Sequence, residues 1–240
     1  MTRIGLGGGT AAHGTERRGA PARRPVAKAR RHLRLGHDRR RRQIIESAAR
    51  YFAAHGFHGG TRVLARYIGI SQSLFYHYFR SKDDLIAEVY RYLFESRWKP
   101  EWEQIFDDPE LSARQKIVRF YSEYFREVLN AEWTRIFLFA ALSGRDLHKR
   151  NHDVVQDRIF PWLVNEVRGG TGPARRVAEL TDLEFEIAWN LHASIFYLAI
   201  REWVLRLDGR IPLARTIETA VDVFLEGARR LPGDGPERAA

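Results

Sequence analysis

The sequence predicts an all-α protein. Apolar residues recur at the spacing of a helix face over most of the chain, as in Ile45, Ala48 and Phe52. Alternating runs of β-branched residues, which would indicate strands, are lacking. Gly and Pro residues separate the helical segments. The predicted helices cover about residues 39–54, 61–67, 71–78, 82–98, 111–130, 132–143, 149–168, 182–207 and 213–230.

The composition excludes several classes of protein. The chain has 240 residues and is 44% hydrophobic, so it can bury a sizeable core and is not disordered as a whole. It has no cysteine, which excludes disulfides and thiolate metal sites and is typical of cytoplasmic proteins. No uncharged apolar run is long enough to span a membrane, and no apolar segment follows the basic N-terminus as in a secretory signal. We therefore expect a cytoplasmic protein without a membrane segment.

The basic charge is concentrated at one end of the sequence. The net charge is +10, but residues 1–42 contain 13 Arg or Lys and 2 Asp or Glu, whereas the other residues contain 27 and 28. A basic tail suits a polyanion such as nucleic acid or an anionic membrane, although a solvated arm without a specific role has the same composition. The sequence predicts a disordered basic tail (1–37), a three-helix domain with the start of a fourth helix (38–90), a larger helical domain (91–231) and a short C-terminal tail (232–240).

The most informative stretch runs from Gln43 to Val89. Its second and third helices are joined by a short link around Gly69, and such a link sets two helices at a steep angle in a helix-turn-helix unit. Ser71 has the side chain of an N-cap, Gly56 can end the first helix, and Ser81–Asp84 resembles a capping box. The outward side chains of the third helix could reach base edges or phosphates in a major groove. A small three-helix core without a role in DNA binding would share the apolar pattern.

The motifs of this stretch are Gly56-Phe57, Leu64-Ala65, Gly69-Ile70-Ser71, Leu74 to Phe79, and Ser81 to Leu85. Together they resemble the N-terminal DNA-binding domain of TetR/AcrR-type transcriptional repressors. Beyond residue 95 only the helical pattern and the length match that family. The resemblance implies a homodimeric regulator without enzymatic activity or cofactor, which binds double-stranded DNA at a palindromic operator. It further implies that a small-molecule effector in the C-terminal domain moves the fourth helix and releases the DNA.

The resemblance also implies which residues contact DNA. Gln72 and Ser73 would face bases, while Lys82 would contact a phosphate beside the N-terminus of the fourth helix. The complete set of expected DNA-binding residues is Arg41, Arg42, Thr61, Arg62, Gln72, Ser73, Tyr76, His77, Tyr78 and Lys82. Two positions depart from the family pattern. Tyr78 replaces a frequent His, and the chain is one residue short before Leu64, so Gly60 stands where a Thr usually caps the second helix.

Aromatic residues dominate the C-terminal region, where all six tryptophans follow residue 95. Aromatic side chains at helical spacing form a core more often than a pocket. The resemblance to the family nevertheless implies a ligand cavity in this region, which would suit an apolar or aromatic molecule. The expected lining residues are Phe120, Tyr124, Phe137, Trp162, Trp189, His192 and Phe196.

The last two predicted helices suggest a dimer interface. The helix over residues 182–207 carries apolar residues on more than one face, which calls for burial against several partners. Pairing with the helix over residues 213–230, and with the same pair of a second subunit, would form a four-helix bundle. Burial inside one subunit is the alternative. The expected interface residues are Ile187, Leu191, Ile195, Leu198, Ile217, Val221 and Phe224.

Two other function classes compete with a ligand-responsive regulator. The Arg-rich arm could make the chain a nonspecific or architectural DNA binder. His148 and His152 are spaced by four residues and would share a helix face, as in half of a zinc site. Because no Glu follows His148 as in a metalloprotease, and Lys149 and Arg150 stand between the two, solvated surface histidines are the simpler interpretation. We expect no metal site and no catalytic residues.

Overall fold

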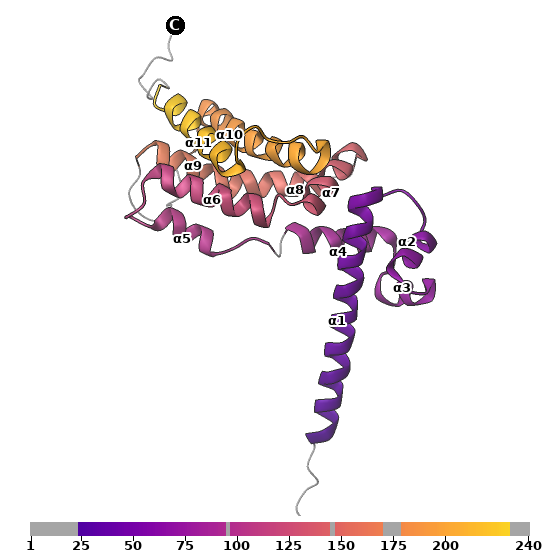
Figure 1. Cartoon of the computed structure of the whole chain (residues 1–240). Coiled ribbons are helices and arrows are strands. Elements are labelled where there is room, and N and C mark those ends of the chain that lie inside the picture. Colours follow the sequence, from indigo (N-terminus) through magenta and orange to yellow (C-terminus); the bar gives the residue numbers. More distant parts are fainter. Residues whose placement is uncertain (1–23, 95–96, 145–146, 170–178, 231–240) are drawn as a thin grey trace, which may run out of the picture. The chain divides into compact units, whose positions relative to one another are not determined.

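The computed structural model describes residues 24–94, 97–144, 147–169 and 179–230, and no strand occurs among them. The all-α fold class is confirmed. Figure 1 shows the helices, whose bounds are α1 (Arg24–His55), α2 (Thr61–Ile68), α3 (Gln72–Tyr78), α4 (Lys82–Phe94), α5 (Glu101–Asp107), α6 (Ala113–Glu127), α7 (Ala131–Leu142), α8 (Leu147–Val154), α9 (Phe160–Val167), α10 (Asp182–Ile200) and α11 (Leu213–Ala228), with π-helical turns at η1 (Val155–Ile159) and η2 (Arg201–Leu205).

The first helix begins earlier than the sequence predicted. α1 starts at Arg24, whereas the helical pattern was expected from about residue 39 and the preceding residues were expected to be disordered. Nine of the 15 residues from Arg24 to Asp38 are Arg, Ala, Lys or Leu, which are all strong helix formers. Residues 1–23 of the predicted tail lie outside the described residues. The chain divides into two compact units between Arg40 and Arg41, and the helix packing below concerns the second.

The α1, α2 and α3 segments form a small core around Phe52, Leu64 and Phe75, which are fully buried. Gly69 ends α2 in the left-handed conformation (φ 78°), where a residue with a Cβ would be strained. The Ser71 side chain accepts a hydrogen bond from the Leu74 amide at 3.1 Å and caps α3 as predicted. The helix-turn-helix geometry therefore follows from local sequence signals.

Three features of the C-terminal helices were not predicted. α5 is a separate short helix that begins at Glu101, because Trp102, Ile105 and Phe106 place a buried stripe just after Pro100. The expected helix over residues 149–168 is interrupted by η1, which ends at Ile159, two residues before Pro161. Proline lacks an amide hydrogen and clashes with the preceding turn, and a π-helical turn relieves that clash. The expected helix over residues 182–207 likewise ends in the π-helical turn η2.

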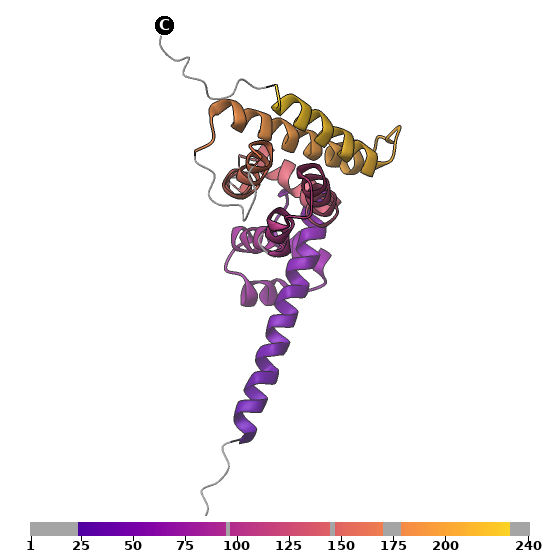
Figure 2. The same cartoon turned by 90° about the vertical axis from the view of Figure 1, so that its left-hand side faces the viewer.

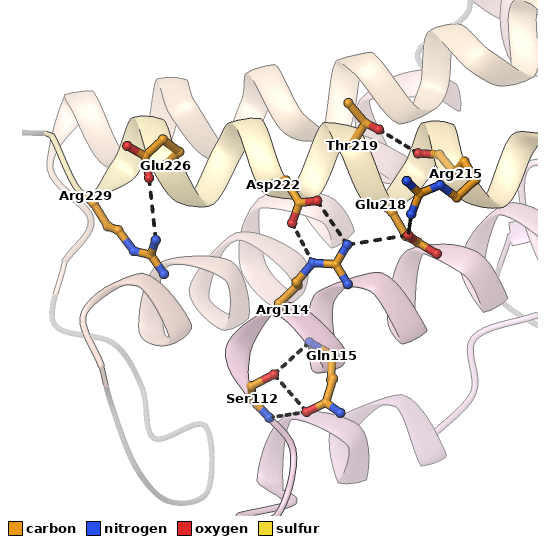
Figure 3. A network of polar contacts seen from close by, with 9 residues as sticks. All are labelled: Ser112, Arg114, Gln115, Arg215, Glu218, Thr219, Asp222, Glu226 and Arg229. Carbon is orange, nitrogen blue, oxygen red and sulfur yellow. Dashed lines mark hydrogen bonds and ion pairs between the residues drawn. The ribbon is translucent and has the colours of Figure 1, made fainter. Parts of the chain in front are cut away.

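α10 and α11 lie side by side in both views (Figure 1, Figure 2), and α11 also packs on α6. Figure 3 shows the polar contacts that hold α11 to α6. The Arg114 guanidinium donates from Nε to Asp222 Oδ1 at 2.6 Å and from Nη2 to Asp222 Oδ2 at 3.0 Å, a bidentate pair. The Arg114 side chain also lies 3.5 Å from Glu218 Oε2. One face of α11 is thus fixed to α6, while Val223 on another face of the helix is 69% exposed.

α6 and α9 are joined by a buried ion pair. The Lys116 ammonium donates to Glu166 Oε1 and to the Phe106 carbonyl oxygen, each at 3.0 Å. Both charged side chains are buried, so each needs the other to offset the loss of hydration. Among the described residues, no helix has the length and apolar character needed to cross a membrane.

Candidate nucleic-acid interface

The α3 helix presents a polar face to solvent. Phe75 is fully buried and anchors the helix, while Leu74 is half-buried beside it. Four of the expected DNA-binding residues, Gln72, Ser73, Tyr76 and His77, are exposed, and the first two were expected to face bases. Tyr78 differs from them, because it is half-buried and packs against the core. α3 therefore offers amide, hydroxyl, phenol and imidazole groups on one short, well-anchored helix.

The start of α2 touches this face. The Thr61 hydroxyl lies 3.2 Å from the Tyr76 hydroxyl, and Gln72 Nε2 donates to Thr61 Oγ1 at 3.3 Å. The residue before it, Gly60, is the N-cap of α2 and makes no side-chain capping bond. Thr61 thus supplies its hydroxyl to two residues of α3. Arg62, the next residue, is exposed beside this group.

Lys82 is bound within the domain. Its ammonium group donates to the carbonyl oxygens of Phe57 at 2.5 Å and Gly59 at 2.6 Å, both in the loop between α1 and α2.

The expected capping box at the start of α4 is partly present. The Asp84 amide donates to Ser81 Oγ at 3.0 Å, but the Asp84 carboxylate accepts from the Arg80 amide and not from Ser81.

The two expected arginines at the start of the folded unit are placed differently. Arg41 donates to the buried Glu88 of α4 at 2.9 Å, and its guanidinium lies 5.2 Å from the centre of the Phe79 ring. Glu88 also accepts a hydrogen bond from Arg91. Arg41 therefore links α1 to α4 and to the end of α3. Arg42 is exposed, with its Nε 3.6 Å from Glu46.

The seven expected pocket residues lie in one continuous aromatic cluster. Five are buried, and Trp189 and Phe196 are half-buried. The cluster passes from Trp162 to Phe120, Tyr124, His192 and Trp189, then through His152 to Phe137 and Phe196, with ring centres 5.1 to 6.2 Å apart. The sequence did not predict that His152, Trp102 and Phe106 belong to this aromatic cluster. For Trp102 and Phe106, their helical spacing with Ile105 could have indicated a buried face.

His192 is a neutral base at the centre of this cluster. Burial, with a smaller contribution from the nearby His152, lowers its pKa to about 3. The Tyr121 hydroxyl lies 3.4 Å from His192 Nδ1, and burial raises the pKa of Tyr121 well above its ordinary value. Near pH 7, His192 and Tyr121 are therefore both uncharged.

The expected dimer residues fall into two groups. Ile195, Ile217 and Val221 are buried within the subunit, and Leu198 is half-buried. Leu191 and Phe224 are buried as well, but together with the half-buried Ile187 they line an apolar surface groove of about 470 Å³ between α10 and α11. Ile211, Val223 and several small or polar residues complete its lining, and Val223 is 69% exposed.

His152 does not fit the surface position that its pairing with His148 suggested. Its ring is half-buried and lies 5.1 Å from the Trp189 ring and 6.1 Å from the Phe137 ring. The His148 side chain lies outside the described residues. Within the described part of the chain, no group of three His, Cys, Asp or Glu residues could hold a metal ion.

Comparisons with known proteins point to one family. The sequence model described as "Bacterial regulatory proteins, tetR family" matches residues 44–89. No curated protein matches the chain. A putative transcriptional regulator from Pseudomonas aeruginosa PAO1 is similar in structure, with 20% identity, a TM-score of 0.59, and coverage of 80% of this chain and 91% of its own.

Two further solved structures are similar over nearly their whole length. A putative TetR-family regulator from Mesorhizobium loti MAFF303099 has 16% identity and a TM-score of 0.56, and the match covers 79% of this chain and 96% of that protein. The fatty acid degradation regulator FadR from Bacillus halodurans has 17% identity and a TM-score of 0.57, with 77% and 97% covered. At these identities the likeness establishes the fold.

Proposed function

We propose that this chain is a DNA-binding transcriptional regulator of the TetR type, and that it acts as a homodimeric repressor that binds a palindromic operator. An apolar or aromatic small molecule, bound among the aromatic residues of the C-terminal helices, releases it from DNA. The observation that supports DNA binding is the exposed polar face of α3. Gln72, Ser73, Tyr76 and His77 are turned to solvent on a helix that Phe75 anchors, as readout of a major groove requires.

Dimerisation is supported by the apolar groove between α10 and α11. One recognition helix contacts few base pairs, so two-fold pairing supplies both affinity and operator symmetry. The proposed interface no longer includes Ile195, Ile217 and Val221, because these side chains are buried within one copy of the chain. It consists of the groove, with the exposed Val223. Ile187, Leu191 and Phe224 remain part of it.

The proposed effector chemistry follows from the aromatic cluster. Its rings offer apolar contact area, and His192 is uncharged at neutral pH, so the cluster suits a neutral apolar or aromatic molecule better than an anion. The rings contact one another in the structure, and an effector would have to separate them. That requirement supports a coupling in which binding shifts α4 and the attached DNA-binding domain, provided that the effector binds the DNA-incompetent state more tightly.

The proposal is tested by selecting bound duplexes from fragmented genomic DNA with the purified full chain. We expect a pseudo-palindromic site whose half-sites are one helical turn apart, or a multiple of it. Gln72→Ala should weaken that binding and change the preferred bases, whereas Leu142→Ala, at an exposed position of α7, should leave both unchanged. Binding without sequence preference, abolished by deleting residues 1–38, would instead favour a nonspecific binder that uses the basic arm.

A further inference from the structure

Lys82 and Thr61 connect α4 to the base-reading face through an unbroken set of contacts. The Lys82 ammonium holds the carbonyl oxygens of Phe57 and Gly59 at 2.5 and 2.6 Å. Gly59 is followed by Gly60, the N-cap of α2, and then by Thr61. The Thr61 hydroxyl in turn contacts Gln72 and Tyr76 at 3.3 and 3.2 Å. These contacts run from the first residue of α4 to two side chains of α3.

The loop between α1 and α2 depends on such a tether. Gly56 and Gly59 both have positive φ angles, 66° and 85°, and a glycine-rich segment loses more backbone entropy on ordering than other sequences do. The N-cap Gly60 supplies no side-chain bond to fix the start of α2. The two charge-assisted hydrogen bonds from Lys82 are the strong contacts described for this loop, because an ammonium donor strengthens a hydrogen bond to a carbonyl.

We propose that Lys82 and Thr61 are positioning residues of the recognition surface: Lys82 fixes the loop between α1 and α2, and Thr61 fixes the side chains of Gln72 and Tyr76. Any displacement of the start of α4 then alters the presentation of the base-reading groups. This inference rests on the proposed DNA-binding function. It assigns Lys82 a role within the protein, in place of the phosphate contact that the resemblance to the family implies.

Salt dependence separates these two roles. A cation that neutralises a phosphate releases counterions, so its removal lowers the slope of log affinity against log salt by about one per protomer. A positioning residue lowers the affinity at every salt concentration and leaves the slope unchanged. Arg62 provides the matched control, since it is an exposed cation beside Thr61 and was expected to contact a phosphate.

The experiment compares Lys82→Met and Arg62→Gln on a duplex selected by the unmodified full chain, over a series of KCl concentrations. Lys82→Met should weaken binding about tenfold, as expected for the loss of a charge-assisted hydrogen bond, with an unchanged salt slope. Arg62→Gln should lower the slope. Lys82→Arg, which keeps a cationic donor, should recover part of the affinity. A slope that falls by about one per protomer in Lys82→Met would overturn the inference.

Thr61 is tested through base preference. Thr61→Val keeps the shape of the side chain and removes the hydroxyl, so renewed selection should return broader preferences at the bases read by Gln72 and Tyr76. Thr61→Ser keeps the hydroxyl and should restore the original preference. An unchanged preference in Thr61→Val would exclude the proposed role of Thr61.

Hydrogen exchange of the DNA-free protein tests the tether without relying on the proposed function. In Lys82→Met, the amides of residues 57–61 should exchange faster than in the unmodified chain, while the amides of α6 should not change. Equal exchange in that loop would refute the tether. Faster exchange in a protein that selects no duplex would support the tether and reject the DNA-binding function.

Discussion

The His192 imidazole lies among Tyr121, Tyr124 and His152, at the centre of the aromatic cluster. Burial lowers its pKa from 6.5 to about 3, so it is uncharged in the folded protein at every pH above that value. The unfolded chain exposes the same group to water, where its pKa is near the ordinary value. Between these two pKa values the unfolded state binds a proton that the folded state does not.

This difference makes stability depend on pH. The free energy of unfolding should fall as the pH decreases from about 6.5 towards 3, and the part due to His192 should reach about 2 kcal/mol at pH 5. His192→Asn removes the titrating group and keeps a polar partner for Tyr121. Its loss of unfolding free energy between pH 7.5 and pH 5 should be smaller by that amount, as measured by urea unfolding at both pH values.

The comparison uses differences between two pH values, so a general destabilisation by the substitution cancels. Other histidines titrate in both proteins and cancel as well. If His192→Asn and the unmodified chain lose the same free energy on acidification, the imidazole is not held neutral by burial.

Some contacts of single residues could be predicted from the sequence, and others could not. Ser71 acts as the predicted cap of α3, because a capping bond joins residues three apart and needs no tertiary information. The engagement of Lys82 with the carbonyls of Phe57 and Gly59 could not be predicted in this way. Its partners lie more than 20 residues away, and only the folded domain brings them together.

At the scale of helices, the end of α1 contacts α7. Gly56 follows α1 with a φ of 66°, and a Cβ built on it would meet the Phe139 ring at 3.0 Å. Gly69, which ends α2, has a similar φ of 78° but no atom within 4 Å of such a Cβ. The two glycines thus share the same backbone strain and differ in the space around them.

Gly56→Ala should therefore destabilise the protein more than Gly69→Ala. Both substitutions introduce a left-handed alanine, at a cost of about 1 kcal/mol. Gly56→Ala also forces the Phe139 ring to move, which should cost about 1 kcal/mol more. Urea unfolding of the two variants measures the difference, and Phe139→Leu in the Gly56→Ala background should reduce it. Equal losses in the two single variants would contradict a packed contact between α1 and α7.

Helix positions could largely be predicted from the sequence, whereas helix interruptions could not. α2, α3, α6, α7 and α11 lie within about three residues of their predicted bounds, since their caps and apolar spacing are local. α5 was not predicted, because Pro100 was interpreted as the end of the preceding helix and not as the residue at which a new helix begins. Pro161 is a local signal for an interruption of the helix over residues 149–168, but the continuation of the chain through a π-helical turn, and not a complete break, depends on packing around α9.

At the scale of the whole molecule, the sequence could not decide which face of the last two helices is internal. Apolar residues occupy several faces of the segment over residues 182–207. The hydrophobic pattern therefore does not indicate which of these faces packs inside the protein. The fold turns Ile195, Ile217 and Val221 inward. The bidentate pair between Arg114 and Asp222 fixes α11 on α6 (Figure 3). The groove between α10 and α11 is lined by other residues of α11 and is open at the surface.

An exposed apolar groove is costly in water, and a second copy of the chain would cover it. Val223→Glu should prevent this pairing, because the new carboxylate would be buried against apolar side chains without a partner. In light scattering after size-exclusion chromatography at micromolar concentration, we expect the unmodified chain to be a dimer and the variant to be a monomer. Its affinity for a full palindromic site should fall to that for a half-site, since two linked recognition helices bind far more tightly than one.

Leu142→Glu provides the control for this experiment, because Leu142 is 85% exposed at the end of α7 and outside the groove. It adds the same charge and should leave both the dimer and the binding of the full site unchanged. A folded Val223→Glu protein that remains dimeric would place the dimer contact elsewhere on the molecule. A monomer that still distinguishes a full site from a half-site would separate operator recognition from dimerisation, and the two-fold arrangement of recognition helices would then have to be abandoned.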